Sequence, residues 1–451
     1  MATVLRRLGS GAYYGKMTIS FWVKRSKLGE QGIFGRREGS ATANLSTCHF
    51  GGDDTLLINF RDGGGTSKYY MITNRKFRDV GAWYHIVFAI DGTNSTAGDR
   101  SKLYINGVRE TSFALLNNPS STGYEVNMFV GGSYHTYIAR GLRSQTDAWL
   151  TFEGCMSHFH CSTGYTYDAS VFGSTDSTTG EWKINTSPTF TLGTDGFTVL
   201  KDGNTITDQS SNSNDFSLYS GTLTKTEDNP SNVFCNFMSH TTSSLLTLNN
   251  GGTTVTTNSS SNSGDSLGSL GASSGKFYWE VEIDSKVGGV PYWGVVYTDN
   301  AKFGLQNLAG GPGSPFGAVF ALSAGGAFYN GTGNGGNIAT GAWADGDICG
   351  MAYDFDNGAM YCYKNGVAVG GGNPTSGASR TNAITTWTPN GVELVPITEA
   401  YNGSIAKFNF GNGYFGTTAV SSAGSNASGN GIFEYDVPTG YTALSTKGLN
   451  L

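Results

Sequence analysis

The chain has 451 residues, of which 14% are charged, 13% are aromatic and 67 are glycine, and its net charge is −6. Ample apolar residues and a small net charge exclude a disordered chain. No basic patch interleaved with aromatic residues indicates nucleic acid, and no apolar run reaches the roughly 18–20 residues of a membrane span. Residues 1–16 lack the apolar segment of a secretory signal and the six cysteines are sparse, so we expect mostly free thiols in a reducing cytosol.

Short alternating segments fill the first third of the chain. In "MTISFWVKR" (17–25), Ile19, Phe21 and Val23 fall on one face of a predicted strand and the residues between them on the other. The same pattern recurs at 55–62, 82–91, 101–111, 127–133 and 152–162, and one helical turn is expected at 165–173. Short strands at regular spacing, separated by turn residues, predict an antiparallel sandwich or barrel.

The pattern repeats after a polar stretch at about 200–230. Segment 243–261 resembles a hairpin with a Gly-Gly turn, and further strands are predicted at 275–284, 292–299, 346–369 and 406–411. "LYINGV" (103–108) and "CYKNGV" (362–367) each place Asn-Gly between apolar runs, and this pair suits a type I′ hairpin turn, which needs positive φ at both central residues. Two such hairpins in separate cores predict an all-β chain of two β-sandwiches.

Two segments resemble known sandwich families. "WYHIVFAIDGT" with "DRSKLYINGVRE" (83–110) resembles the hairpin region of laminin-G-like, concanavalin A-type domains, whereas "GKFYWEVEI" (275–283) with 346–367 resembles a SPRY domain. Both resemblances imply antiparallel jelly-roll sandwiches. We therefore expect a laminin-G-like domain at 1–200, a polar linker at 201–230, a SPRY-like domain at 231–412 and a C-terminal tail at 413–451.

The order of the segments along the chain carries a further resemblance. Together with the two domains, segments 172–183, 208–216, 228–238 and 438–451 are similar to tailed-phage proteins, especially those of phages that infect marine bacteria. This resemblance implies a virion structural protein on the surface of a head or tail, as a head decoration, head fibre or tail fibre. It implies assembly in the host cytoplasm, capsid or tail proteins as partners, a homo-oligomeric state and contact with host surface polysaccharide or reinforcement of the shell.

Two residue clusters invite catalytic or metal hypotheses. In "CMSHFHC", strand alternation puts Cys155 and Cys161 on the core face and His158 and His160 on the solvent face, so they cannot converge on one zinc ion without a bulge. In "EVEID", three alternating carboxylates, Glu280, Glu282 and Asp284, resemble the acidic row of concanavalin-fold glucanases but in a different order. We expect Glu280 to be partly paired at the start of a solvated strand face.

Acidic and aromatic residues near turns are the remaining candidates. We interpret the acidic residues near turns as turn formers, with a calcium site on the first domain as the alternative. These residues are Asp53, Asp54, Asp91, Asp99, Asp354 and Asp356. Aromatic residues in the predicted loops most often fill a core, and stacking against a sugar is the alternative. These residues are Tyr134, Tyr137, Trp149, Trp343 and Trp387. No nucleophile elbow, phosphate loop or zinc-protease motif is present.

No catalytic, binding or metal-ligating residue is therefore assigned from the sequence, and no cofactor is expected. The favoured function is a non-enzymatic, lectin-like virion protein, which touches neither nucleic acid nor the interior of a membrane. Two alternatives stay open: a polysaccharide hydrolase using the row that contains Glu282, and a cellular adhesion or recognition module.

Overall fold

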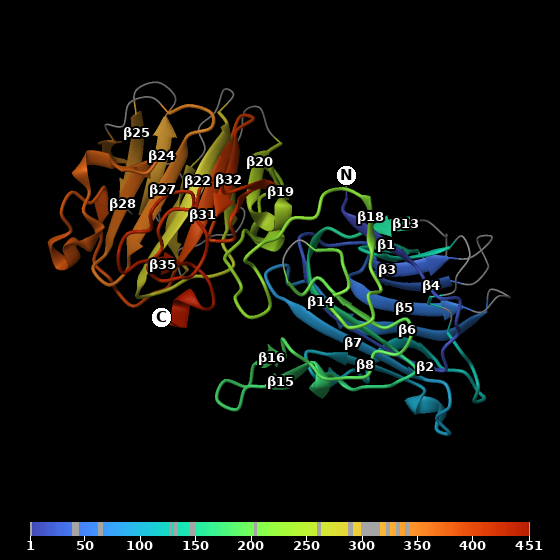
Figure 1. Cartoon of the computed structure of the whole chain (residues 1–451). Helices are drawn as coiled ribbons and strands as arrows, with labels where there is room; N and C mark the ends of the chain where they lie inside the picture. Colours follow the sequence, from blue (N-terminus) through green and yellow to red (C-terminus); the bar gives the residue numbers. More distant parts are fainter. Residues whose placement is uncertain are drawn as a thin grey trace. The chain divides into compact units, whose positions relative to one another are not determined.

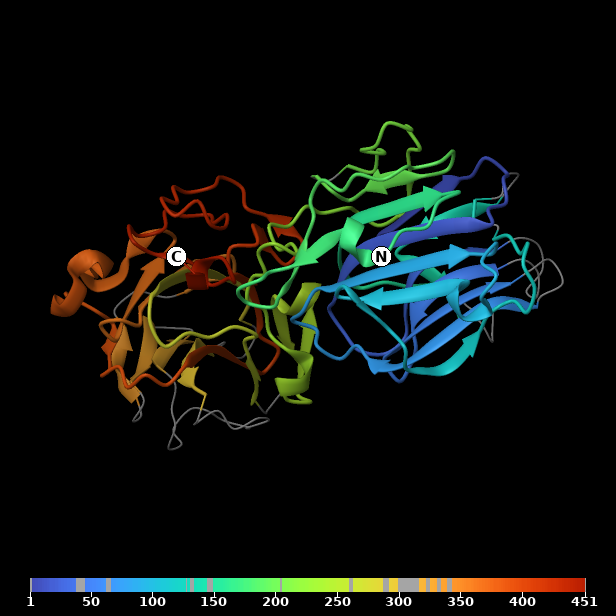
Figure 2. The same ribbon diagram turned by 90° about the horizontal axis from the view of Figure 1, so that it is seen from below.

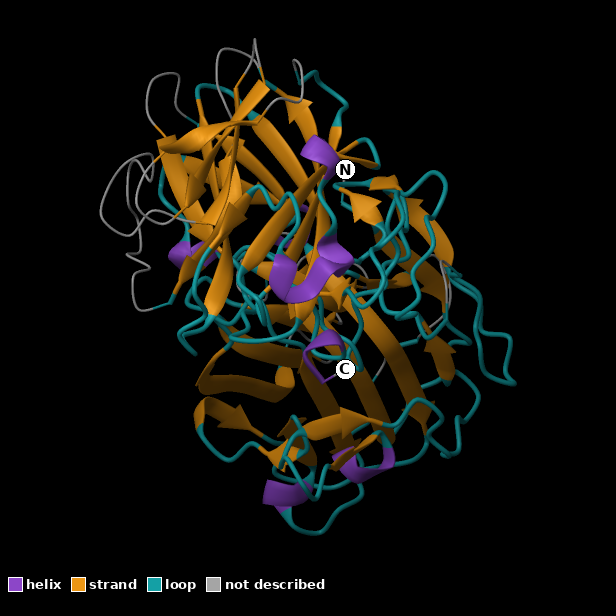
Figure 3. Ribbon diagram, turned by 90° about the vertical axis from the view of Figure 1, so that its left-hand side faces the viewer, coloured by secondary structure: helices purple, strands orange, loops and turns teal. Residues whose placement is uncertain are grey.

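The structure, a computed structural model, divides the chain into two compact units, Met1–Lys225 (unit 1) and Thr226–Leu451 (unit 2). It describes residues 2–37, 45–61, 66–126, 128–129, 134–143, 149–202, 205–258, 263–286, 292–298, 316–321, 325–330, 334–338 and 343–450. Strands and loops dominate both units, and the described helices are short 3₁₀ turns (Figures 1 and 3). None of these helices is both long enough and apolar enough to cross a membrane.

Unit 1 is a sandwich of two antiparallel sheets. The first sheet has the order β10-β6-β5-β4-β3-β11-β1-β18, with β1 Val4–Leu8, β3 Gln31–Arg37, β4 Leu45–Phe50, β5 Thr55–Arg61, β6 Ser67–Lys76, β10 Phe113–Asn117, β11 His135–Ile138 and β18 Ser217–Ser220. The second has the order β17-β14-β2-β7-β8-β9, with β2 Lys16–Arg25, β7 Tyr84–Asp91, β8 Ser101–Ile105, β9 Val108–Arg109, β14 Gly154–Thr163 and β17 Phe197–Val199 (blue to green in Figure 2).

The core of unit 1 lies between these sheets, and the predicted alternation is confirmed. Ile19, Phe21 and Val23 all point into it. The opposite face of β2 is also buried, with Trp22 only 4% exposed. Residues 164–192 cover this face with a 3₁₀ turn (Ala169–Val171) and a hairpin of β15 Gly173–Thr175 and β16 Trp182–Ile184, seen beneath β7 and β8 in Figure 1. A second hairpin, β12 Arg140–Leu142 and β13 Trp149–Thr151, packs on β3 of the first sheet.

Unit 2 is likewise a two-sheet sandwich. One sheet has the order β19-β20-β32-β22-β27-β28-β29, with β19 Leu246–Asn249, β20 Thr254–Thr257, β22 Lys276–Ser285, β27 Ile348–Asp354, β28 Ala359–Lys364, β29 Val367–Ala368 and β32 Ile405–Asn409; β30 Thr385–Thr386 and β35 Thr442–Ala443 pair beside it. The other has the order β21-β31-β23-β24-β25-β26, with β21 Ser263–Leu267, β23 Tyr292–Tyr297, β24 Phe316–Ala321, β25 Gly325–Asn330, β26 Asn334–Ile338 and β31 Leu394–Tyr401; β33 Tyr414–Phe415 and β34 Thr418–Ala419 form a separate hairpin.

Both Asn-Gly hairpins form as predicted and use the same contacts. Asn106 and Asn365 have φ of 47° and 48°, and the glycine after each also has positive φ. The Oδ1 atom of each Asn accepts a backbone N–H from an earlier strand, that of His85 in unit 1 and of Ile348 in unit 2, both at 2.8 Å. Each glycine then lies against an aromatic ring of a later segment, Trp182 in unit 1 and Tyr435 in unit 2.

The segments expected as linker and tail are packed parts of the two units. Residues 217–220 form β18, which pairs with β1, so most of the polar segment 201–230 belongs to unit 1. Residues 413–450 cover the outer face of one sheet of unit 2, where Phe433, Val437 and Tyr441 are buried and β35 runs parallel to β22. Polar composition was therefore a poor guide here, because hydrogen-bonded loops can pack as tightly as strands.

Candidate functional site

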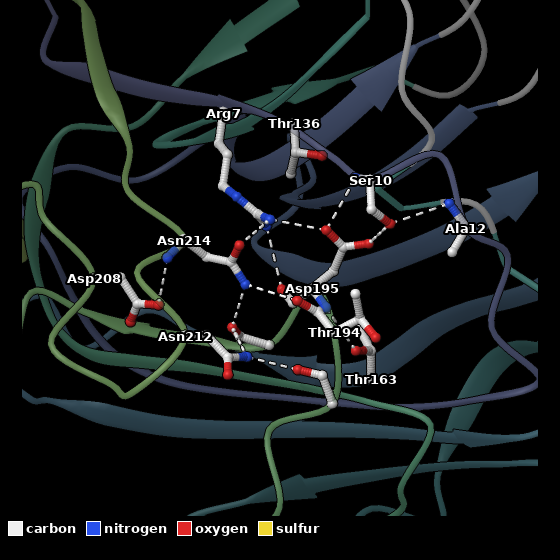
Figure 4. Close-up of polar contacts among 12 residues, drawn as sticks. Arg7, Ser10, Ala12, Thr136, Thr163, Thr194, Asp195, Asp208, Asn212 and Asn214 are labelled. Carbon is white, nitrogen blue, oxygen red and sulfur yellow. Dashed lines mark hydrogen bonds and ion pairs between the residues drawn. The ribbon is translucent and has the colours of Figure 1, made fainter.

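A buried carboxylate fastens the segment that leads into β18. The Asp195 side chain has 0% relative exposure and accepts hydrogen bonds from the Arg7 Nη2 atom at 2.8 Å, the Ser10 backbone N–H at 3.0 Å and the Tyr14 hydroxyl at 2.8 Å. Arg7 Nη2 also donates to Asn214 Oδ1 at 2.6 Å (Figure 4). This network holds Asp195 and Asn214 against Arg7 of β1, so the chain emerges next to β1 and adds β18 to the sheet edge.

The motif "DQSSNSND" (208–215) shapes the loop just before β18. Asp208 accepts the backbone N–H of Thr198, Ser210 and Asn214, each within 2.9 Å. The amides of Asn212 and Asn214 in turn donate to backbone carbonyls of residues 193–196 (Figure 4). Short side chains with carboxylate or amide groups are needed here because only they reach backbone groups this close.

The β12–β13 hairpin lies close to the sheet because glycines face one another. A Cβ atom added to Gly32 would stand 2.1 Å from the backbone nitrogen of Gly141, and one added to Gly35 would stand 3.0 Å from its Cα. Any side chain at these positions would lift the hairpin. This close approach sets Arg140 and Trp149 beside Tyr137 of β11.

These elements bring arginine and aromatic side chains together into what we name the arginine–aromatic cluster: Arg6, Tyr137, Arg140, Trp149 and Tyr219. The guanidinium carbon of Arg140 lies 4.2 Å from the Trp149 ring centre, 4.9 Å from that of Tyr219 and 5.0 Å from that of Tyr137. Arg6 lies 5.2 Å above Tyr219. The Tyr137 ring meets Trp149 and Tyr219 edge to face, at 5.1 and 5.4 Å.

The cluster is open to solvent and built for planar ligands. Tyr219 is 44% exposed, and the other members are half-buried. Aromatic rings offer apolar faces, and guanidinium groups offer planar hydrogen-bond donors. The arrangement can therefore stack a sugar ring and donate hydrogen bonds to its oxygens.

Of the loop aromatics considered from the sequence, the structure gathers Tyr137 and Trp149 in this cluster. Tyr134 lies apart, 6.0 Å from the Arg36 guanidinium carbon. The sugar-binding alternative is wrong for Trp343 and Trp387, which are 1% and 6% exposed and belong to the core of unit 2. Sequence reasoning missed Tyr219 because it lies in a stretch assigned as a linker; the alternation in "FSLYS" (216–220) was the available signal.

The expected faces of "CMSHFHC" are partly wrong. His158 has φ of 48° and forms a bulge, so Met156, Phe159 and Cys161 face the core and Cys155 does not. The histidines are not solvent-facing: His158 and His160 are 8% and 3% exposed, and Phe172 and Phe190 of the segment 164–192 pack against His160. Within the described part of the chain, no group of three or more His, Cys, Asp or Glu side chains could hold a metal ion, and the cysteines are free thiols.

The buried histidines pack among aromatic rings, and His160 stacks on Phe172. His85 lies between Trp22 and Trp182, with ring centres 4.7 and 5.9 Å away and rings within 18° of parallel. The Trp182 indole donates to His85 Nδ1 at 3.0 Å, so the neutral imidazole carries its proton on Nε2 and donates to Ser20 Oγ at 2.9 Å. Burial lowers the pKa of His85 to about 3, of His158 to about 4 and of His160 to about 3.

The carboxylate row of β22 is divided between two structural tasks. Glu280 is fully buried and accepts the backbone N–H of Glu434 and Tyr435 at 2.8 Å each, and burial raises its pKa to about 7. Glu280 is paired, as expected, but the strand face that begins with it is not solvated at this position. Glu282 and Asp284 both face Lys407, with Glu282 at 3.6 Å. The row therefore has two structural roles. Glu280 holds residues 432–436 against β22, and Glu282 and Asp284 form ion pairs with Lys407.

The acidic residues considered for calcium have structural partners. Asp53 pairs with Lys76, Asp54 with Arg25, and Asp99 with Arg109. Asp91 accepts the backbone N–H of Thr93 at 3.0 Å, as predicted for a turn former. The other two serve different loops: Asp354 accepts the backbone N–H of Asn357, whereas Asp356 accepts that of the distant Gly275.

Comparison with known proteins relates unit 1 to one superfamily. Residues 10–142 match the concanavalin A-like lectin/glucanases superfamily. The matched segment contains Tyr137 and Arg140 of the arginine–aromatic cluster. It begins after Arg6 and ends before Trp149 and Tyr219. No curated protein matches the sequence. The concanavalin A-like fold occurs in glycosidases and in non-enzymatic lectins alike.

Several solved structures are similar to parts of the chain. The SPRY domain of human HERC1 is 18% identical, covering 38% of this chain and 96% of that one, with a TM-score of 0.29. A heptameric SAP-like pentraxin from Limulus polyphemus is 15% identical, covering 37% and 72%, with a TM-score of 0.26. Domain 4 of AbnA, a GH43 arabinanase from Geobacillus stearothermophilus solved with arabinotriose, is 20% identical, covering 36% and 67%, with a TM-score of 0.26.

Proposed function

We propose that the chain is a non-enzymatic, lectin-like adhesion protein and that the arginine–aromatic cluster is its glycan contact. The observation that carries the proposal is the set of three rings around Arg140, of which Tyr219 is exposed and Tyr137 and Trp149 are half-buried, on a sandwich whose residues 10–142 match a lectin and glucanase superfamily. Stacking of a sugar on aromatic faces gives a low affinity at one site. The overall avidity becomes high when many copies of the protein bind the same surface. The carboxylate row does not favour hydrolysis, because Glu280 binds backbone N–H groups.

The glycan contact is tested with the full-length chain on an array of bacterial surface polysaccharides. Tyr219→Ala removes a cluster ring and should abolish the binding seen for the parent chain. Tyr165→Ala is the matched control, because Tyr165 is equally exposed, at 45%, but lies in the segment that covers the other sheet. Equal binding by the parent and Tyr219→Ala chains would refute the assignment of the cluster.

We further propose that the chain is displayed on a tailed-phage virion, as a head decoration, head fibre or tail fibre, and assembled in the host cytoplasm as a homo-oligomer with capsid or tail proteins as partners. The order of segments 172–183, 208–216, 228–238 and 438–451 along the chain supports this proposal. Immunogold labelling of purified particles, imaged by cryo-electron microscopy, tests it. Gold on the head or the tail would support a virion role and give the location, whereas unlabelled particles would refute it.

A further inference from the structure

The arginine–aromatic cluster contains two positive charges without a carboxylate. In the described part of the chain, neither Arg6 nor Arg140 forms an ion pair. Six other arginines of unit 1 do form them: Arg7 with Asp195, Arg25 and Arg78 with Asp54, Arg75 with Glu110, Arg109 with Asp99, and Arg143 with Glu30. The positive charge of the cluster is a local feature, because the whole chain has a net charge of −6. A concentrated positive site on an acidic protein indicates a specific anionic ligand more than a general charged surface.

One of these groups also has an unused donor. The Nε atom of Arg6 is buried and has no hydrogen-bond partner. A guanidinium carries five N–H donors, and a buried donor left without an acceptor destabilises the free protein. Because this Nε atom is out of contact with solvent, a ligand next to Tyr219 would use the terminal N–H groups of the same guanidinium.

The aromatic rings restrict what the anion is attached to. Arg140 is held over Trp149, Tyr137 and Tyr219, so its guanidinium plane is fixed by contacts with ring faces and edges. Both guanidinium groups lie over the Tyr219 ring, and this side chain is 44% exposed, so a ligand that meets both arginines also meets the exposed part of Tyr219. A pyranose ring with an acidic substituent meets both conditions, because its C–H face stacks on the aromatic ring while its anionic oxygens accept from the guanidinium groups.

We infer that the cluster binds an acidic saccharide, with its carboxylate or sulfate on Arg6 and Arg140 and its ring on Tyr219. This inference rests on the proposed glycan contact and adds the ligand class. The probes are oligogalacturonate, its carboxyl-reduced counterpart with the same rings and linkages, and the pair dextran sulfate and dextran. Binding to the full-length chain is measured by calorimetry at low and at physiological ionic strength.

Acidic probes should bind at least about tenfold more tightly than their neutral counterparts, since charge-assisted hydrogen bonds are the stronger kind. The difference should shrink at higher salt. Arg140→Gln should remove most of this preference. Arg143→Gln is the matched control, because it removes the same charge from the same hairpin region but from an arginine that already pairs with Glu30. Arg140→Lys keeps the charge and should weaken binding to an intermediate degree, because it loses the planar fork.

The outcomes separate this inference from the one on which it rests. If neutral and acidic probes bind equally and Tyr219→Ala abolishes both, the glycan contact stands and the acidic-ligand inference is refuted. If Arg143→Gln weakens binding as much as Arg140→Gln, a general charge effect replaces the site and the inference is refuted. If no probe and no array polysaccharide binds, both are refuted. Near-ultraviolet circular dichroism of each variant confirms that the unit is folded. Comparison of the carboxylated with the sulfated probe identifies the anion.

Discussion

Lowering the pH from 7 to 5 should weaken unit 1 and strengthen unit 2. In unit 1, four buried imidazoles have pKa values lowered to about 3 or 4, those of His49, His85, His158 and His160. Because the pKa of each imidazole is lower in the folded chain, the unfolded chain takes up its proton at a higher pH, near the ordinary imidazole pKa of about 6.5. Stability is therefore full above that value and is lost as the pH falls from there toward 3–4.

The magnitude follows from linkage. Between pH 7 and pH 5, each of these imidazoles lowers the free energy of unfolding by about 1.8 kcal/mol, so together they remove up to about 7 kcal/mol, a large part of the stability of an ordinary domain. In unit 2, burial raises the pKa of Glu280 to about 7 from its ordinary value of 4.5, so its contribution to stability rises as the pH falls. That gain is about 2 kcal/mol over the same interval.

Urea unfolding at pH 7 and pH 5 measures the change in the free energy of unfolding. Hydrogen exchange of peptides from each unit, corrected for the pH dependence of the intrinsic exchange rate, assigns the change to unit 1 or unit 2. His158→Gln removes one imidazole and should reduce the pH dependence of unit 1 by about 2 kcal/mol. The matched control is His240→Gln in unit 2, which should leave unit 1 unchanged. A unit 1 that is as stable at pH 5 as at pH 7 would refute the reasoning.

Three substitutions test other contacts. Gly107→Ala places a Cβ atom 2.3 Å from the Trp182 ring at a φ of 78°, and should lower the stability of unit 1 by about 1–3 kcal/mol in thermal unfolding, whereas Gly98→Ala, with no atom nearby, should not. Glu280→Ala leaves two buried backbone N–H groups without acceptors and should expose residues 413–450 to protease; unchanged protection would count against the anchor role. Asp195→Asn breaks a buried ion pair and should cost about 3 kcal/mol by urea unfolding, with an unchanged midpoint contradicting the role shown in Figure 4.

The sequence predicted features that depend on local geometry. Alternation placed Ile19, Phe21 and Val23 in the core because side chains on a strand alternate between faces. The hairpins at Asn106 and Asn365 were predictable because few residue pairs tolerate positive φ in succession.

Features set by distant segments were not predictable in this way. The bulge at His158 interrupts the alternation of β14, so Met156 rather than Cys155 faces the core together with Phe159 and Cys161, and nothing in "CMSHFHC" marks where the extra residue lies. The burial of Trp22 depends on residues 164–192 folding over it, although a large apolar side chain on the otherwise polar face of β2 was a signal. Tyr219 reaches the cluster only because Asp195 fixes the preceding loop.

The position of β18 gives unit 1 a particular response to mechanical force. β1 and β18 are antiparallel neighbours, with Val4 opposite Ser220, so the two ends of the unit leave from the same place. A pull applied across these ends separates the two strands one hydrogen bond at a time, whereas strands leaving in opposite directions would break their bonds together. β18 is an edge strand and carries Tyr219, so tension would detach this ring before the sandwich opens. For the glycan contact that we propose, a load applied across these two ends would thus release the ligand while the fold remains intact.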